Sequence, residues 1–278
     1  MTVYLIGARG RLGQAIAREY ADDGLESLDR SVYGDWSQPG AKDRVSHYFA
    51  LRAKPGSTIF VASGLLDPKL PDTDLQGVNY HLPKNVIDGV AGLGIRVLTF
   101  GTVMERLLRA QNPYIQSKAA LGAHASAAAA GGGSVAHLQI HTLFGVGQPS
   151  PFMFLGQMLA ALRDSTEFRM TSGRQLREYH HLEDEARAVR LIAESNSTGV
   201  LNVSHGEPIS LASIAHAVFQ SCGREDLLQI GALPDPPEEN YEKILSPIDG
   251  LESVEFRDSL PAIIKYMQAC HPRLEVHE

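Results

Sequence analysis

A tyrosine and a lysine four residues apart carry the clearest chemical potential in this sequence. The stretch NPYIQSK at 112–118 contains Tyr114 and Lys118, and residues with this spacing share one face of a helix. Because the pKa of a free tyrosine is about 10, Tyr114 would exchange protons near neutral pH only if a nearby positive charge stabilised its phenolate. Lys118 could supply that charge. The pair alone does not separate an acid–base site from two ordinary helix residues.

The sequence around this pair predicts strands that alternate with helices. Short apolar runs predict buried strands, and windows with apolar residues three or four apart predict helices. The expected strands lie at 3–7, 58–64 and 95–101, and the stretch 135–145 is expected to be a strand that runs into a loop. The expected helices lie at 11–24, 79–94 and 114–130. Such an alternation is typical of a doubly wound α/β fold with a parallel sheet.

The regular alternation of expected strands and helices ends after residue 145. Helices are expected at 152–162 and 210–223. We therefore expect a first domain over 1–145 and a smaller, partly interleaved lobe over 146–278. Within that lobe, residues from about 175 to 205 are expected to return to the first domain.

The composition argues against nucleic-acid and membrane partners. The net charge is −7, and lysine and arginine are not concentrated in any segment, whereas nucleic-acid-binding proteins carry basic patches. No run of about 20 apolar residues is present to span a membrane. Because the N-terminus MTVYLIGARG has no charged leader and no cleavage signal, we expect a cytoplasmic protein.

The histidines and cysteines do not show the spacing of a metal site. His180 and His181 are adjacent, whereas two ligands on one helix face are four residues apart. Cys222 and Cys270 match no metal-binding spacing, and in the absence of a secretion signal we expect them to be reduced structural thiols. We expect no metal site.

A glycine-rich loop follows the first expected strand. The stretch GARGRLG places glycines at Gly7, Gly10 and Gly13, directly before the first expected helix. A loop without side chains lets the backbone approach a pyrophosphate at the helix N-terminus. The same glycines could form a tight turn without a ligand, but their position after the first strand favours a cofactor site. The candidate contacts in this loop are Gly7, Arg9, Gly10, Arg11, Leu12 and Gly13.

Together these motifs give the chain a family resemblance. With Tyr114 and Lys118, the G-x-x-G-x-x-G spacing resembles the short-chain dehydrogenase/reductase superfamily, in its extended branch that modifies nucleotide sugars. The segments VASG, GVNYHLPKNVID, REYHHLEDEARAV and TGVLNVSHGEPISLASIAHAV resemble further motifs of that branch, in the correct order. The resemblance covers most of the chain. It implies a Rossmann-type fold that binds NAD or NADP, and a homodimer.

The resemblance also implies catalytic roles. Tyr114 would donate or accept the proton at the substrate oxygen, while Lys118 would tune Tyr114 and hold the nicotinamide ribose. A threonine at the end of strand five of the family would bond the reacting oxygen, and the alignment of RVLTFGT favours Thr102, with Thr99 as the alternative. The twelve residues from Thr102 to Tyr114 are fewer than this branch usually has, so the loop over the site is expected to be shortened. Further cofactor contacts are expected at Ala62, Ser63, Gly64 and Asn79.

The residues after the second strand bear on the choice of coenzyme. Asp29 would favour NAD by accepting a hydrogen bond from the adenosine ribose. Arg30, together with Arg9 in the glycine loop, would instead bind the 2′-phosphate of NADP. Asp35 matches a position that often contacts adenine in the family. We expect NADP, with NAD as the alternative.

Later motifs suggest the substrate and the reaction. Arg177 is expected to bind the diphosphate of a nucleotide sugar, because a guanidinium bonds two phosphate oxygens at once. Phe144 begins the stretch FGVGQ, which resembles a loop that covers the substrate. The segment around Arg177 is most similar to CDP-abequose and CDP-paratose synthase-type reductases. Val103 and Met104 follow Thr102 where dehydratases of the branch carry Asp and Glu, which disfavours dehydration.

These points favour an NAD(P)H-dependent reductase that acts on a nucleotide-activated 4-keto-6-deoxyhexose. One alternative is a nucleotide-sugar 4-epimerase that retains NAD. A second alternative is a protein that binds NADP without chemistry, as a sensor or scaffold; the presence of both Tyr114 and Lys118 counts against it.

Overall fold

The computed structural model describes residues 2–107 and 112–271. The chain divides into two compact units whose segments alternate along the sequence. Unit 1 comprises Met1–Ile140, Ala186–Val203 and Pro247–Ser253. Unit 2 comprises His141–Glu185, Ser204–Ser246 and Val254–Glu278. Residues 186–203 thus return to unit 1, whereas residues 175–185 belong to unit 2.

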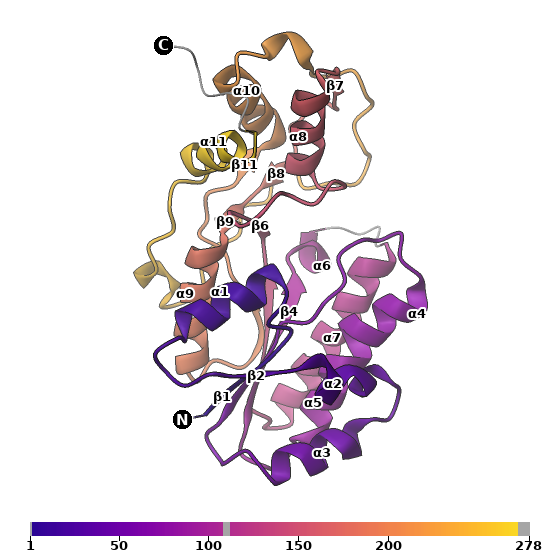
Figure 1. Cartoon of the computed structure of the whole chain (residues 1–278), viewed down its shortest axis with the longest axis vertical. Helices are drawn as coiled ribbons and strands as arrows, with labels where there is room; N and C mark the ends of the chain where they lie inside the picture. The colour runs from indigo at the N-terminus through magenta and orange to yellow at the C-terminus, as the bar shows by residue number, and fades with distance from the viewer. Residues whose placement is uncertain (1, 108–111, 272–278) are drawn as a thin grey trace. The chain divides into compact units, whose positions relative to one another are not determined.

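A six-stranded parallel sheet forms the centre of unit 1 (Figure 1). Its strand order is β10-β5-β4-β3-β1-β2, and every neighbouring pair runs parallel. The strands are β1 (Val3–Ile6), β2 (Glu26–Leu28), β3 (Thr58–Val61), β4 (Arg96–Thr102), β5 (Val135–Ile140) and β10 (Gly199–Asn202). The predicted α/β class with a doubly wound parallel sheet is confirmed.

Helices cover both faces of this sheet. Figure 1 shows α1 and α9 on one face and α3, α5 and α7 on the other. The helices of unit 1 are α1 (Arg11–Glu19), α2 (Arg30–Tyr33), η1 (Gly34–Ser37), α3 (Lys42–Ala50), α4 (Asp72–Leu75), η2 (Gln76–His81), α5 (Leu82–Gly89), α6 (Met104–Leu107), α7 (Pro113–Ala130) and η4 (Leu251–Ser253). Helix α9 (Leu182–Glu194) begins in unit 2 and continues in unit 1.

Three expectations about these elements were wrong in detail. The helix expected at 11–24 ends at Glu19. The helix expected at 79–94 consists of the π-helix η2 and then α5, which ends at Gly89. The strand that carries Thr102, expected as strand five, is the fourth along the chain.

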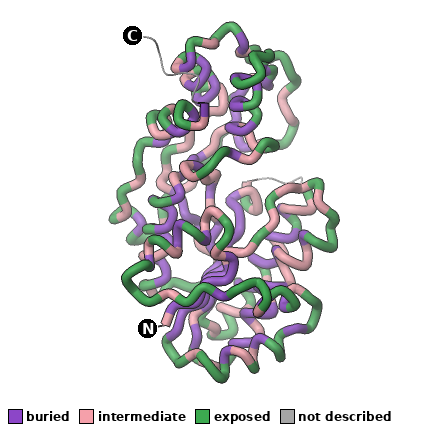
Figure 2. The backbone as a smooth tube through the Cα atoms, viewed as in Figure 1, coloured by how far each residue is buried: buried purple, intermediate pink, exposed green. Residues whose placement is uncertain are grey.

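The core of unit 1 lies between the sheet and helices α3, α5 and α7. Strands β1 and β3 are buried at every position (Figure 2), as expected for strands covered on both faces. Side chains from the strands and from α3, α5 and α7 form one apolar cluster that includes Ile6, Phe49, Val61, Val86, Val97 and Leu121. This packing fixes the strand ends from which the glycine loop and Thr102 extend.

In its described part, up to residue 271, unit 2 consists of short strand pairs and three longer helices. Strand β6 (Thr142–Phe144) pairs in parallel with β9 (Tyr179–His181). The stretch 135–145, expected as a strand that runs into a loop, thus contains two strands separated at His141. The remaining elements are α8 (Phe154–Asp164), β7 (Phe168–Arg169), β8 (Leu176–Arg177), β11 (Ile209–Ser210), α10 (Leu211–Ser221), η3 (Glu225–Leu227), β12 (Leu228–Gln229) and α11 (Ser259–Cys270). Helices α8, α10 and α11 contribute side chains to the apolar core of this unit.

Two further sequence expectations concern membranes and cysteines. Within residues 2–107 and 112–271, no helix has both the length and the apolar character that crossing a membrane requires. Cys222 is buried and Cys270 is partly exposed, and neither forms a disulfide.

Candidate active site

The glycine loop joins β1 to α1 and packs closely against the loop after β3. Gly7 has a φ of +93°, and a Cβ atom there would lie 2.4 Å from the backbone nitrogen of Ser63. A Cβ atom on Gly13 would lie 2.2 Å from the carbonyl oxygen of Gly7. Side chains are therefore excluded at both positions, and the backbone amides near the start of α1 stay accessible to a phosphate. This arrangement fits a dinucleotide cofactor.

Asn79 connects the loop after β3 to helix α7. The buried Asn79 side chain accepts a hydrogen bond from the backbone nitrogen of Leu65 at 2.8 Å and donates one to the carbonyl oxygen of Leu65 at 3.0 Å. It also donates to Ser117 Oγ at 3.2 Å, and Ser117 Oγ donates to the carbonyl oxygen of Tyr114 at 2.7 Å. The expected cofactor contact Asn79 thus holds the Ala62–Ser63–Gly64 loop in place beside α7.

The start of α7 sets the position of Tyr114. The Asn112 side chain caps the helix by accepting a hydrogen bond from the backbone nitrogen of Ile115 at 3.0 Å, and Pro113 occupies the first helical position. Both features are typical of helix N-termini. Tyr114 and Lys118 consequently lie one turn apart on the same helix. Tyr114 is partly exposed, whereas Lys118 is buried.

Lys118 is anchored on strand β4. Its Nζ donates a hydrogen bond to the carbonyl oxygen of Phe100 at 2.8 Å. A Cβ atom on Gly64 would come within 3.4 Å of the same Nζ, so the ammonium lies beside the loop expected to contact the cofactor. Burial lowers the pKa of Lys118 to about 8, and the negative charge of Glu105 partly opposes that effect. The ammonium charge is therefore expected to be present at neutral pH.

Thr102 and Tyr114 form a hydrogen-bonded pair. Thr102 is the last residue of β4, and its side chain bonds that of Tyr114. Burial raises the pKa of Tyr114, the charge of Glu105 raises it further, and the bond to Thr102 acts in the opposite direction. Without a cofactor, Tyr114 is thus a protonated phenol at neutral pH, which suits a proton donor. The alternative, Thr99, instead bonds His137 Nδ1 at 2.9 Å and is fully buried.

A buried polar network around Glu105 holds the backbone of Thr102 in place. The sequence analysis did not identify this network. Glu105 Oε1 accepts a hydrogen bond from the backbone nitrogen of Thr102 at 2.6 Å. Its other oxygen, Oε2, accepts one from Gln139 Nε2 at 3.2 Å and lies 3.4 Å from His137 Nε2. Burial disfavours the charged form, yet bonds to His137, Thr102 and Gln139 keep the pKa of Glu105 below its ordinary value.

Two glycines make room for this network. A Cβ atom on Gly101 would lie 2.2 Å from His137 Nε2 and 2.3 Å from Glu105 Oε1. A Cβ atom on Gly122, in the middle of α7, would lie 2.9 Å from Glu105 Oε2. The sequence offered two signals for this buried network. They are Gly101, in the segment GTVME, and Gly122, in the middle of an alanine-rich helix.

The candidate coenzyme-selecting residues lie on the surface around the end of β2. Asp29 caps α2 by accepting from the backbone nitrogen of Ser31 at 2.9 Å, and its other oxygen accepts from Arg9 Nη2 at 3.1 Å. The bond from Ser31 is the main cause that lowers the pKa of Asp29. Arg30 begins α2 and is exposed, and Asp35 forms an ion pair with Arg44.

The two expected substrate contacts belong to unit 2. Arg177, on β8, is paired with Glu239 and also donates to the carbonyl oxygen of Leu176 at 2.8 Å. Phe144 ends β6 and is 1% exposed, in contact with the rings of Tyr179, His181 and Tyr266. The structure thus connects Tyr114, Lys118, Thr102, Asn79 and the glycine loop within unit 1, and it places Arg177 and Phe144 in unit 2.

Comparison with known proteins adds a family assignment. A model of the NAD dependent epimerase/dehydratase family matches residues 3–204. The matched region contains the glycine loop, Thr102, Tyr114, Lys118 and Arg177. No curated protein sequence gives a match.

Solved structures share the fold over nearly the whole chain. The UDP-glucose 4-epimerase of Thermotoga maritima, solved with UDP-glucose, has a TM-score of 0.78 at 14% identity, with 99% of this chain and 100% of that chain covered. MoeE5 in complex with UDP-glucuronic acid and NAD has a TM-score of 0.75 at 20% identity, covering 98% and 99%. A dTDP-4-dehydrorhamnose reductase of Clostridium acetobutylicum has a TM-score of 0.73 at 13% identity, covering 97% and 99%.

Proposed function

The chain belongs to the NAD-dependent epimerase/dehydratase family, and on this basis we propose that it reduces a nucleotide-activated 4-keto-6-deoxyhexose to the hydroxy sugar. The observation that carries the proposal is the hydrogen-bonded pair of Thr102 and Tyr114 beside the buried ammonium of Lys118. A protonated phenol held by a hydroxyl at a strand end is suited to protonate a developing alkoxide.

The position of Glu105 supports reduction over dehydration. Loss of water from a sugar requires an acid and a base at the reacting carbons. Glu105 is the acidic residue nearest in sequence to Thr102, but its carboxylate bonds the Thr102 backbone nitrogen and Gln139 and faces His137. The side chains between them, Val103 and Met104, carry no acid or base.

The proposed mechanism assigns one task to each side chain. Bound coenzyme supplies the hydride that reduces the C4 carbonyl carbon. Thr102 Oγ1 polarises the carbonyl oxygen, and Tyr114 Oη gives that oxygen its proton. Lys118, held by the carbonyl oxygen of Phe100, favours the resulting phenolate through its positive charge. Solvent then returns a proton to Tyr114, which restores the starting state.

For the coenzyme, we propose NADP(H). Arg9 extends from the glycine loop to Asp29 at the end of β2, and its side chain is 80% exposed. Arg30 lies next to Asp29 and is also exposed. Two guanidinium groups at this position would bind a 2′-phosphate. With NAD, Asp29 would instead accept a hydrogen bond from the free 2′-hydroxyl.

For the substrate, we propose a nucleotide diphosphate sugar, bound through Arg177. The named complexes with UDP-glucose and UDP-glucuronic acid support this class. Arg177 is partly buried and paired with Glu239, so the guanidinium is fixed in place before a diphosphate arrives. The predicted contact at Phe144 and the predicted homodimer remain predictions.

A 4-epimerase is the second candidate, because the family includes epimerases and the same Tyr–Lys–Thr set would serve a hydride that returns to the sugar. Purified protein should be mixed with coenzyme deuterated at C4 of the nicotinamide and with a panel of nucleotide-activated 4-keto-6-deoxyhexoses. A parallel set of reactions should contain nucleotide sugars that carry a C4 hydroxyl. A reductase oxidises the coenzyme and moves deuterium to the sugar C4. Interconversion of C4 epimers without consumption of added coenzyme would establish the epimerase instead.

A further inference from the structure

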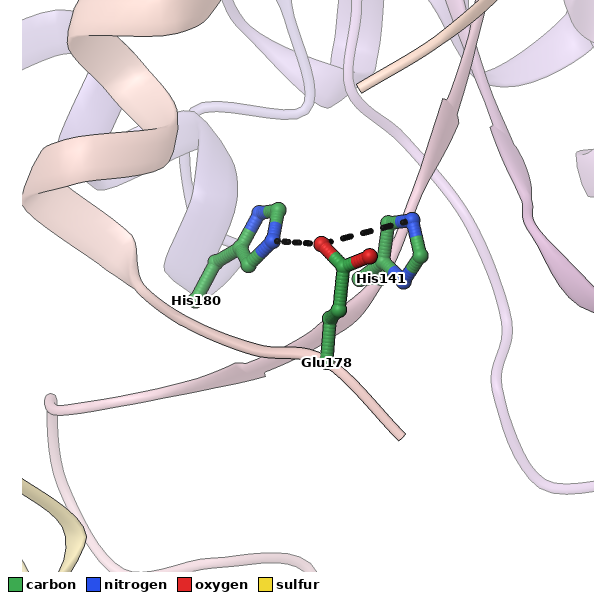
Figure 3. Close-up of side chains that lie close together, drawn as sticks. All are labelled: His141, Glu178 and His180. Carbon is green, nitrogen blue, oxygen red and sulfur yellow. Dashed lines mark hydrogen bonds and ion pairs between the residues drawn. The ribbon is translucent and has the colours of Figure 1, made fainter. Parts of the chain in front are cut away.

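Unit 2 contains a buried cluster of histidines around Glu178 that the proposed reaction does not use. His141 lies between β5 and β6, Glu178 precedes β9, and His180 lies within β9. The pairing of β6 with β9 brings these segments together. Figure 3 shows the His141 and His180 rings directed at the Glu178 carboxylate from two sides. The three side chains are at most 4% exposed.

One oxygen of Glu178 is the point where the ring nitrogens converge. His180 Nε2 lies 3.2 Å from Glu178 Oε2, and His141 Nε2 lies 3.9 Å from the same atom. These ligand atoms all lie within 4.8 Å of one another. A zinc ion holds nitrogen and oxygen ligands at about 2.0–2.2 Å in a tetrahedron, which separates ligand atoms by roughly 3.3–3.5 Å. The two separations from Glu178 Oε2, 3.2 and 3.9 Å, are near those that a bound ion requires.

The surroundings of the cluster match those of metal-binding histidines. His180 Nδ1 lies 2.7 Å from Glu185 Oε2, and both side chains are fully buried. Such a carboxylate keeps the proton on Nδ1 and leaves Nε2 for the metal. The Glu178 carboxylate is itself oriented by Ser204 Oγ at 2.6 Å and by the backbone nitrogen of His205 at 2.9 Å.

His205 supplies an independent indication of a missing ligand. Its Nδ1 accepts a hydrogen bond from the backbone nitrogen of Glu207 at 3.2 Å, so in the neutral ring the proton is on Nε2. Nε2 is buried, has no hydrogen-bond partner, and lies 3.8 Å from Glu178 Oε2. Buried donors without an acceptor are rare. An ion pair of His180 with its two carboxylates would not explain this donor, whereas a water held within the cluster would.

We propose that His141, Glu178 and His180 bind one zinc ion. A water completes the tetrahedron and accepts the hydrogen bond from His205 Nε2. Two imidazoles and a carboxylate form a ligand set that suits zinc. The ion would link His141, the first residue of one segment of unit 2, to Glu178 and His180 at β9. Through the water, it would also link these residues to His205, near the start of the segment Ser204–Ser246. This site is independent of the proposed reductase activity.

The test is a zinc titration of the full-length, untagged chain after removal of metals with a chelator. Isothermal titration calorimetry is expected to show one zinc per chain with a Kd below about 1 μM. Cobalt(II) added in place of zinc is expected to give the intense visible absorption of a tetrahedral site. Zinc is also expected to raise the thermal unfolding midpoint, since it binds the folded chain.

Matched variants locate the ion. H141Q and H180Q keep size and polarity, and each is expected to weaken zinc binding at least about 100-fold. H216Q, at an exposed position of α10, should bind zinc as the wild type does. If the two ligand variants fail to fold, E185Q serves in their place, with an expected loss of roughly tenfold because the His180 partner loses its charge. Wild-type protein that binds no zinc, or an affinity that all the folded cluster variants preserve, would overturn the proposal.

Discussion

The carboxylate of Glu105 accepts a hydrogen bond from the backbone nitrogen of Thr102 at 2.6 Å. This bond holds the backbone of Thr102, the last residue of β4. Because the carboxylate is buried and also faces His137 and Gln139, we propose that it positions Thr102 and takes no part in the reaction itself. Glu105 is the first acidic residue after Thr102, and we propose that it is a structural support and not a catalytic base.

Replacement of Glu105 with glutamine tests this role. The E105Q variant keeps the shape of the side chain but loses the charge that strengthens its bonds to Thr102 and Gln139. We expect the free energy of unfolding to fall by about 1.5–3 kcal/mol, the usual value of a hydrogen bond to a charged group. Urea denaturation measures the change. A variant as stable as the wild type would contradict the proposed support of Thr102.

The Lys118 ammonium is expected to titrate well below the range of an ordinary lysine. Burial lowers its pKa from 10.5 to about 8. The unfolded chain therefore holds more protons at this residue between pH 8 and 10.5, so the contribution of Lys118 to the free energy of unfolding rises with pH across that window. NMR of protein labelled with ¹³C-lysine should show one signal with a midpoint near pH 8, assigned by its loss in K118R. A midpoint near 10.5 for this signal would contradict the burial of Lys118.

The E105Q variant provides a control for the titration of Lys118. The negative charge of Glu105 raises the pKa of Lys118, so the Lys118 midpoint should move to lower pH in the E105Q variant.

Gly122 provides a test of the packing around the buried network. In the interior of an exposed helix, alanine is more stable than glycine by about 1 kcal/mol. At Gly122 a Cβ atom would lie 2.9 Å from Glu105 Oε2, so we expect G122A to lose about 1–3 kcal/mol through overpacking. The control is G131A at the end of α7, where a Cβ atom would meet nothing closer than 3.4 Å. Thermal unfolding compares the two, and equal midpoints would argue against a tightly filled network.

The Arg9 side chain is expected to set the preference for NADP. The R9Q variant should raise the KM for NADPH roughly tenfold, because one charge-assisted hydrogen bond to the phosphate is lost, and should leave the KM for NADH unchanged. The control R18Q changes an exposed arginine on helix α1, which follows the glycine loop. The NADP assignment is wrong if the wild-type protein prefers NADH and the D29N variant loses that preference. Asp29 would then be the residue that binds the adenosine ribose of NAD.

Much of unit 1 could be predicted from sequence because its signals are local. The apolar runs at β1, β3 and β4 predict strands that are buried on both faces, and the glycine spacing after β1 follows from the close approach of Gly7 to Ser63. Asn112 and Pro113 mark the start of α7 and hence the position of Tyr114.

The rest of the site depends on contacts between residues distant in sequence. Glu105 and His137 are 32 positions apart, and only the pairing of β4 with β5 brings them together. The histidine cluster was missed for the same reason. His180 and His181 alone lack a metal spacing, whereas the partners of His180 are His141, in a different segment, and Glu178. The stretch VAHLQIHTLFG mixes apolar and polar residues across both β5 and β6, so the sequence pattern does not mark the break at His141.

The most direct test of the central claim is the effect of the Y114F substitution on turnover and on coenzyme binding, measured side by side. The phenol is the proposed proton donor, and general acid catalysis typically contributes about 10²- to 10⁴-fold to the rate. We predict that Y114F lowers kcat for 4-keto sugar reduction by that factor while the Kd for NADPH stays within about twofold, and that Y48F on α3 changes neither. Full activity in the Y114F variant would remove Tyr114 from the mechanism and contradict the account.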